Sequence, residues 1–133
     1  MATVTAGITL TSAVGDLLTD ALSLSDSTSV TALHTTGLAR TRIDKTAVHN
    51  DADVIFTASS YGAPAYLYVK NIQTTASHCI YIYDGTTTGS PVLLKLAGGD
   101  WAFMPINAGL TLKAYGSTAN FVLEHITFGT EPA

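Results

Sequence analysis

The chain has 133 residues, of which only 12% are charged, and its net charge is −4 with six basic side chains spread along the sequence. This length suits one domain with its own core, and scattered basic residues exclude the basic stripe that nucleic-acid binding needs. The longest uncharged stretch, residues 54–69, is too short and too polar to cross a membrane.

The N-terminal residues contain no basic region followed by a compact apolar segment, so we expect no signal peptide. A single cysteine, Cys79, excludes an internal disulfide and favours folding in the cytoplasm. Thr, Ser and Ala take the places that charges usually occupy, and a surface with few charges associates readily with neighbours. A β-domain without partners is the simpler interpretation of the same composition.

Aromatic residues divide the chain in two, because all eleven lie from Phe56 onward. Aromatic side chains bury large areas and dominate protein cores. We therefore expect residues 53–133 to form the core of the fold. Residues 1–52 are expected to form an N-terminal arm or outer strands that pack on this core or on neighbouring molecules.

The N-terminal third carries its own pattern. Residues 3–11 alternate Thr or Gly with apolar side chains, which predicts a strand. Residues 12–25 have apolar spacing that fits a short helix and flanking serines that fit a strand, so both alternatives stay open. Residues 27–37 and 38–43 predict weak strands, and residues 45–53 predict a loop.

The remaining sequence predicts strands at intervals of eight to twelve residues, with turn residues between them. This pattern is typical of an all-β, antiparallel β-sandwich, for which a jelly-roll-like topology is one form. The tripeptide Gly98-Gly99-Asp100 indicates a tight hairpin between the flanking strands. The predicted strands are 53–58, 65–72, 78–85, 92–97, 101–106, 110–116 and 120–129.

Several predicted strands are apolar on both faces. In residues 66–69, Leu67 and Val69 point to one side and the two tyrosines to the other. A strand at the surface of a monomer usually has one polar face, so the second face needs a cover. We expect four tyrosines to share one sheet face, which then packs on the N-terminal layer, binds another subunit, or stacks sugar rings: Tyr66, Tyr68, Tyr81 and Tyr83.

Catalytic chemistry has little support in the sequence. His49 to Asp53 bring an imidazole and several oxygens together, but without the closing Glu of a calcium loop they indicate a turn rather than a metal site. Cys79 and His78 are neighbours in a strand and face opposite ways, so Cys79 is interpreted as a small buried side chain. We therefore expect no enzyme activity, no cofactor and no metal.

A family resemblance adds to this picture. The run from residue 65 to residue 129 resembles small virion proteins of tailed bacteriophages, in strand and turn positions alone. It implies a structural virion protein, most simply a decoration (cement) protein on the capsid surface, folded in the host cytoplasm. The matching positions are Val69, Lys70, Asn71, Leu96, Gly99, Trp101, Phe103, Pro105, Gly109 and Ala114.

The resemblance implies a homotrimer whose partners are itself and the major capsid protein, with no nucleic acid and no membrane involved. A tail, neck or fibre component and a carbohydrate- or host-receptor-binding module are the alternatives. The seven candidate interface residues are aromatic: Tyr66, Tyr68, Tyr81, Tyr83, Trp101, Phe103 and Phe121.

Overall fold

The computed structural model describes residues 2–16, 18–32, 34–35, 37–47, 53–58, 60–85 and 92–130. These residues form antiparallel β-strands and no helix, which confirms the predicted all-β class. The chain divides into two compact units, Met1–Ala32 and Leu33–Ala133, here called the hairpin unit and the sandwich unit. The predicted outer strands between residues 33 and 52 thus belong to the sandwich unit.

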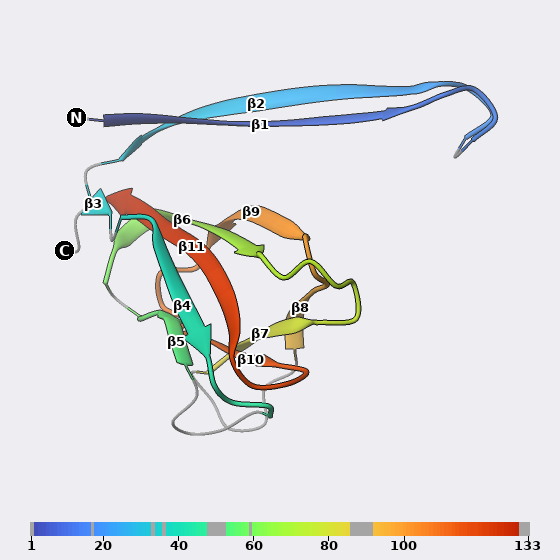
Figure 1. Ribbon diagram of the computed structural model, residues 1–133. Helices are drawn as coiled ribbons and strands as arrows, with labels where there is room; N and C mark the ends of the chain where they lie inside the picture. Colours follow the sequence, from blue (N-terminus) through green and yellow to red (C-terminus); the bar gives the residue numbers. More distant parts are fainter. Residues whose placement is uncertain are drawn as a thin grey trace. The chain divides into compact units, whose positions relative to one another are not determined.

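The hairpin unit consists of β1 (Ala2–Ser12) and β2 (Leu22–Ala32), which run side by side in Figure 1. The two strands pair without a bulge from Ala2 opposite Ala32 to Ser12 opposite Leu22. Hydroxyl and apolar side chains alternate along both strands, and this register places them on opposite faces of the hairpin. Residues 13–16 and 18–21 lie in the turn, so the segment for which helix and strand stayed open contains a turn followed by the start of β2.

The sandwich unit contains two antiparallel sheets. One, here called the β6 sheet, has the order β4-β11-β6-β9, with β3 pairing beside β4 along the same edge of β11. The other, the β7 sheet, has the order β5-β10-β7-β8. The strands are β3 (His34–Thr35), β4 (Ala39–Ile43), β5 (Asp53–Phe56), β6 (Gly62–Asn71), β7 (Ile80–Asp84), β8 (Val92–Leu96), β9 (Trp101–Ile106), β10 (Leu112–Gly116) and β11 (Phe121–Thr130).

The core lies between these two sheets. Alternate residues of β6 and β11, including Leu67, Val69 and Leu123, face alternate residues of the β7 sheet such as Ile80 and Ile82. All of these side chains are fully or almost fully buried. Packing two apolar sheet faces together is the standard arrangement of a sandwich. The core cluster draws mainly on residues after 53, and it also includes Ile43 of β4, which is fully buried.

The hairpin predicted around Gly98-Gly99-Asp100 is wrong. β8 pairs with β7, whereas β9 pairs with β6, so the turn carries the chain from one sheet to the other. The Gly99 amide donates to the Asn71 carbonyl at 2.9 Å, and the Asn71 amide donates to the Asp100 carbonyl at 2.9 Å. A Cβ at Gly98 would overlap the Thr75 carbonyl. These contacts fix the turn against the end of β6.

Asn71 joins the two sheets at this end of the sandwich. Its side chain is fully buried, and its Nδ2 donates to the carbonyls of His78 at 2.7 Å and Leu96 at 2.9 Å. Its Oδ1 accepts the Gln73 amide at 3.1 Å. Buried polar groups need such partners. The Asn71 side chain on β6 thus satisfies one carbonyl just before β7 and one at the end of β8, and it links the β6 sheet to the β7 sheet.

Candidate interaction surfaces

The two faces of the hairpin unit differ sharply in chemistry. One face carries only hydroxyls and one glycine, from Thr3, Thr5, Gly7, Thr9, Thr11, Ser23, Ser25, Ser27 and Ser29. The opposite face carries Val4, Ala6, Ile8, Leu10, Leu22 and Leu24, with Asp26 and Thr28. Ile8, Leu10 and Leu24 are 43%, 46% and 45% exposed. An apolar stripe therefore stays accessible along the hairpin.

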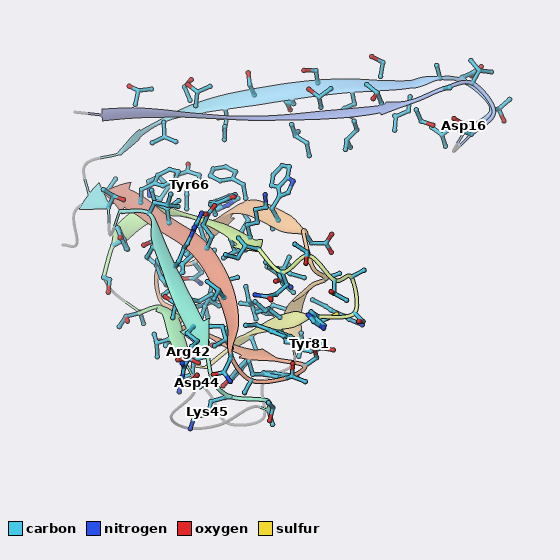
Figure 2. The ribbon with its side chains drawn as sticks, in the orientation of Figure 1. Asp16, Arg42, Asp44, Lys45, Tyr66 and Tyr81 are labelled. Atoms are coloured by element: carbon cyan, nitrogen blue, oxygen red, sulfur yellow. The ribbon has the colours of Figure 1, made fainter. Side chains whose placement is uncertain are left out.

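The turn of the hairpin unit also exposes apolar side chains. The Gly15 amide donates to the Leu18 carbonyl at 2.9 Å, and Gly15 takes a positive φ of 82° that favours glycine. Val14 and Leu18 are at least half exposed, and Asp16 lies beside them at the tip (Figure 2). The tip thus presents apolar groups and the carboxylates of Asp16 and Asp20 to solvent.

The outer face of the β6 sheet is aromatic. The rings of Tyr66, Phe103 and Phe128 lie 5.6–6.0 Å apart and nearly parallel. Trp101 and Phe103 are two positions apart on β9, so their side chains lie on the same face of the sheet. The Trp101 side chain is 52% exposed. Such ring stacks stabilise a sheet face and leave an apolar surface available for contact.

A polar group borders this aromatic face. Glu124 accepts the Arg40 guanidinium at 3.1 Å and the Tyr68 hydroxyl at 3.3 Å. Partial burial, followed by the Glu124 charge and this hydrogen bond, raises the pKa of Tyr68 above its ordinary value. The phenol of Tyr68 therefore stays protonated and serves as a hydrogen-bond donor.

The outer face of the β7 sheet carries a second aromatic group. Tyr81 and Tyr115 stack with ring centroids 4.9 Å apart, and Tyr83 meets Tyr115 at 5.8 Å in a tilted arrangement. Lys95 Nζ lies 5.9 Å from the centre of the Tyr81 ring, within the range of a cation–π contact. Burial first, and then Tyr81 and Tyr83, raise the pKa of Tyr115.

The expectation that four tyrosines share one sheet face is wrong. Tyr66 and Tyr68 lie on the β6 sheet, whereas Tyr81 and Tyr83 lie on the β7 sheet, and Figure 2 shows Tyr66 and Tyr81 in different parts of the sandwich unit. Consecutive strands β6 and β7 belong to different sheets, which local alternation does not reveal.

The other candidate residues divide between surface and core. Trp101 and Phe103 join Tyr66 and Tyr68 on the outer face of the β6 sheet. Phe121 instead belongs to the core and stacks on His78 at 4.9 Å. Tyr83 faces outward with Tyr81 but is only 2% exposed. Candidates on β6 and β9 are thus brought together, Tyr81 and Tyr83 share the outer face of the β7 sheet, and Phe121 lies in the core.

Tyr115 was not among the predicted interface residues. The alternation Lys113-Ala114-Tyr115 places it on the same side as Lys113, away from the buried Ala114. This alternation was a usable signal, but the contact with Tyr81 depends on the pairing of β10 with β7. That pairing joins segments that are distant in the sequence, with Tyr81 opposite Tyr115, and is not visible in a local pattern.

His125 is a buried titratable group of the β6 sheet. It lies buried on β11, and its Nε2 is 2.8 Å from the Thr41 hydroxyl. Among the described residues, its Nδ1 has no hydrogen-bond partner. Burial disfavours the charged ring and lowers the pKa of His125 below its ordinary value.

Metal-ligating side chains do not gather within the described ranges, where no three His, Cys, Asp or Glu residues are placed to hold an ion. Of the predicted His49–Asp53 turn, Asp53 alone lies among the described residues, and its carboxylate accepts the Asp44 amide at 2.9 Å. Cys79 is buried, as expected, but it lies directly before β7 and not within the strand that the sequence predicted.

Comparisons with protein-family models, curated proteins and solved structures gave no match for this chain. The part of the chain that the structure describes has no helix with the length and apolar character of a membrane span. The surfaces above therefore carry the functional interpretation by themselves.

Proposed function

We propose that this protein is a structural subunit of a virion, most simply a decoration protein that binds between major capsid subunits and associates with itself as a homotrimer. The observation that carries the proposal is the hairpin unit. Its apolar stripe is exposed, and a two-stranded hairpin alone is marginally stable in water. Such an element gains its stability by packing on a partner, which is what an assembly arm does.

The topology of the sandwich unit supports this proposal. The strand orders of the two sheets, β4-β11-β6-β9 and β5-β10-β7-β8, fit the order expected for an eight-stranded jelly roll whose strands are numbered along the chain. Jelly rolls occur in viral capsid domains and in lectins. We propose this topology as the finer description of the sandwich; because folds serve many functions, the interaction surfaces must decide among them.

The test is binding to capsid shells assembled from the major capsid protein of the proposed virion. Purified protein is sedimented with the shells, and the shells are heated with and without it. We expect co-sedimentation and a higher disruption temperature of the decorated shell. Light scattering at the lowest concentration measured gives the mass of the free protein, for which a trimer of 13.8 kDa subunits is expected.

Two neighbouring residues of β2 provide a matched pair of variants. Leu24 lies on the apolar face and Ser25 on the hydroxyl face, and both are exposed. We expect Leu24→Lys to weaken shell binding at least tenfold and Ser25→Lys to leave it unchanged. Wild-type protein that does not bind the shells would contradict the decoration role, and equal binding by both variants would exclude the apolar face as the contact.

A second candidate function rests on Tyr81 and Tyr115. Two stacked tyrosines beside Lys95 on an outer sheet face resemble the aromatic platform on which a sugar ring stacks. A carbohydrate- or receptor-binding module predicts saturable glycan binding that Tyr81→Ala abolishes while the solution mass stays unchanged. A glycan array on which wild-type protein and Tyr81→Ala give the same result would remove this candidate.

A further inference from the structure

The free edge of β1 is unusually open for pairing. In an antiparallel pair, alternate backbone amides and carbonyls of each strand point away from the partner strand, and among the described residues β2 alone pairs with β1. Native edge strands are usually protected by lysine, proline or a bulge. β1 has no charged residue and no proline, and its register with β2 is regular over eleven residues.

The sequence of β1 is nearly symmetric about Gly7. At four of the five distances from Gly7, the residues on the two sides have the same chemistry, and only the outermost pair, Ala2 with Ser12, joins an apolar residue to a hydroxyl. A strand with this symmetry is self-complementary when it runs antiparallel to a copy of itself. The equivalent positions are Ala2 with Ser12, Thr3 with Thr11, Val4 with Leu10, Thr5 with Thr9, and Ala6 with Ile8.

We propose that β1 pairs antiparallel with β1 of a second copy, so that a two-fold axis passes between the two copies of Gly7. A two-fold interface requires the same surface on both molecules to be self-complementary, and the symmetry of β1 satisfies this condition. Each pairing joins residues that point to the same side, so from residue 3 to residue 11 hydroxyl meets hydroxyl and apolar meets apolar. The product is a four-stranded sheet, β2-β1-β1-β2.

The hairpin itself does not require a glycine at position 7, but the proposed pairing gives a reason for one. A Cβ at Gly7 would lie 3.6 Å from the Asp26 carbonyl oxygen and 3.7 Å from the Ser27 Cβ, which are ordinary contacts. Glycine weakens a strand and often marks a close approach of another chain. On the proposed axis, Gly7 faces its own copy and keeps the centre of the interface clear.

Charge favours β1 over β2 as the pairing edge. The same operation applied to β2 about Ser27 would place Asp26 opposite Thr28 and bring the two copies of Asp26 into diagonal positions, about 7–8 Å apart. Like charges at this distance repel, whereas β1 brings no charge to its own pairing. The uncharged edge makes about ten backbone hydrogen bonds over eleven residues, as many as a typical protein interface.

The β1–β1 pairing would be one interface of the proposed assembly, with a second copy of the chain as the partner. Its role in a virion rests on the proposed function. It doubles the mass of whatever unit the other surfaces form. The test therefore measures solution mass in a dilution series. Because position 7 pairs only with position 7, Gly7→Glu places two carboxylates directly opposite each other, where like charges are destabilising.

We expect Gly7→Glu and Gly7→Lys each to raise the dissociation constant of the pairing at least tenfold. An equimolar mixture of the two is expected to regain the wild-type mass, because opposite charges then meet at the axis. The matched control is Ser27→Glu, at the position opposite Gly7 within the hairpin, which leaves β1 unchanged and is expected to keep the wild-type mass. Recovery in the mixture requires a folded hairpin.

A cross-link gives an independent measurement. Directly opposite residues in antiparallel strands have Cα atoms about 4.5–5.5 Å apart, which suits a disulfide. We expect Gly7→Cys to form an intermolecular disulfide on mild oxidation and Ser27→Cys to remain monomeric on a non-reducing gel. The native Cys79 is buried and does not compete.

Three results would overturn the pairing: equal masses for wild-type protein and Gly7→Glu, no recovery in the Glu and Lys mixture, or a larger loss from Ser27→Glu than from Gly7→Glu. Shell binding separates this inference from the decoration role. Wild-type protein that binds shells but has the mass of Gly7→Glu contradicts the pairing and leaves the role intact. Protein that pairs through β1 but binds no shell contradicts the role and leaves the pairing intact.

Discussion

The hairpin unit and the sandwich unit are built from the same kind of strand and end in opposite states. In both, apolar and polar residues alternate along the chain. In the sandwich unit, Leu67 and Leu123 are completely buried, whereas in the hairpin unit Ile8 and Leu10 remain more than 40% exposed. Alternation thus decides that a strand forms, and a second layer decides whether its apolar face is buried.

The difference also locates the source of stability in each unit. The sandwich unit packs two sheets over a shared core, so its stability comes from its own residues. The hairpin unit has a single layer, and its described side chains include none that is buried. We infer that its strands are stabilised by a partner, and the predictions below separate the two units by this criterion.

The largest contrast is expected from removing one leucine in each unit. Leu123→Ala leaves a cavity between the sheets and should reduce the free energy of unfolding of the sandwich unit by about 2–5 kcal/mol. Leu10→Ala removes an exposed side chain and should change it by less than about 0.5 kcal/mol. Denaturant titration followed by Trp101 fluorescence measures both, and similar losses would mean that the hairpin unit is part of the core.

Asn71 sharpens the comparison within the sandwich unit. Asn71→Ala leaves buried carbonyls of His78 and Leu96 without the side-chain donor, and each unsatisfied buried group costs about 1–3 kcal/mol. Asn107 is a matched control, because its exposed side chain accepts only the Gly109 amide among the described contacts. Asn107→Ala should cost less than about 1 kcal/mol in the same titration. An equal effect would show that Asn71 does not join the sheets.

His125 predicts how the sandwich unit responds to acid. The folded pKa is lowered by burial, so below about pH 6.5 the unfolded chain binds a proton that the folded chain excludes. The stability contributed by the neutral ring is therefore complete above pH 6.5 and is lost as the pH falls toward the folded pKa. His125→Gln should flatten the fall in unfolding free energy between pH 7 and pH 5.5, and an unchanged slope would contradict this assignment.

The smallest effect is expected at the surface of the β6 sheet. Arg40 is largely exposed where it meets Glu124, and exposed ion pairs contribute about 0.2–1 kcal/mol. Arg40→Ala should therefore lower the unfolding free energy by less than about 1 kcal/mol, and 0.5 M salt should reduce the difference between variant and wild type. A larger, salt-independent loss would show that the aromatic face depends on this ion pair.

The sequence was sufficient to predict the strands and the fold class, because alternation and turn residues are local signals. It was not sufficient to predict sheet partners. The hairpin expected at Gly99 is a crossing between sheets, since Asn71 and Thr75, more than twenty residues earlier, hold the turn against β6. Contacts over such distances leave no period in the sequence.

The same limit applies to the candidate surfaces. Tyr66, Tyr68 and Phe103 were identified because two-sided strands are visible in the sequence, and the pairing of β6 with β9 brings them together. Tyr81 was grouped with the wrong partners, because its neighbour Tyr115 joins it only through the pairing of β7 with β10. Local patterns identify outward aromatic residues, and tertiary pairing decides which ones share a face.

Hydrogen exchange followed by mass spectrometry tests most directly whether the hairpin unit depends on a partner. Peptides from β1 and β2 are compared with peptides from β6 and β11 over a hundredfold range of protein concentration. We predict that protection of β1 and β2 rises with concentration while protection of β6 and β11 stays constant. Protection of the hairpin strands that equals that of the sandwich strands and does not change with concentration would contradict the inference that a partner stabilises them.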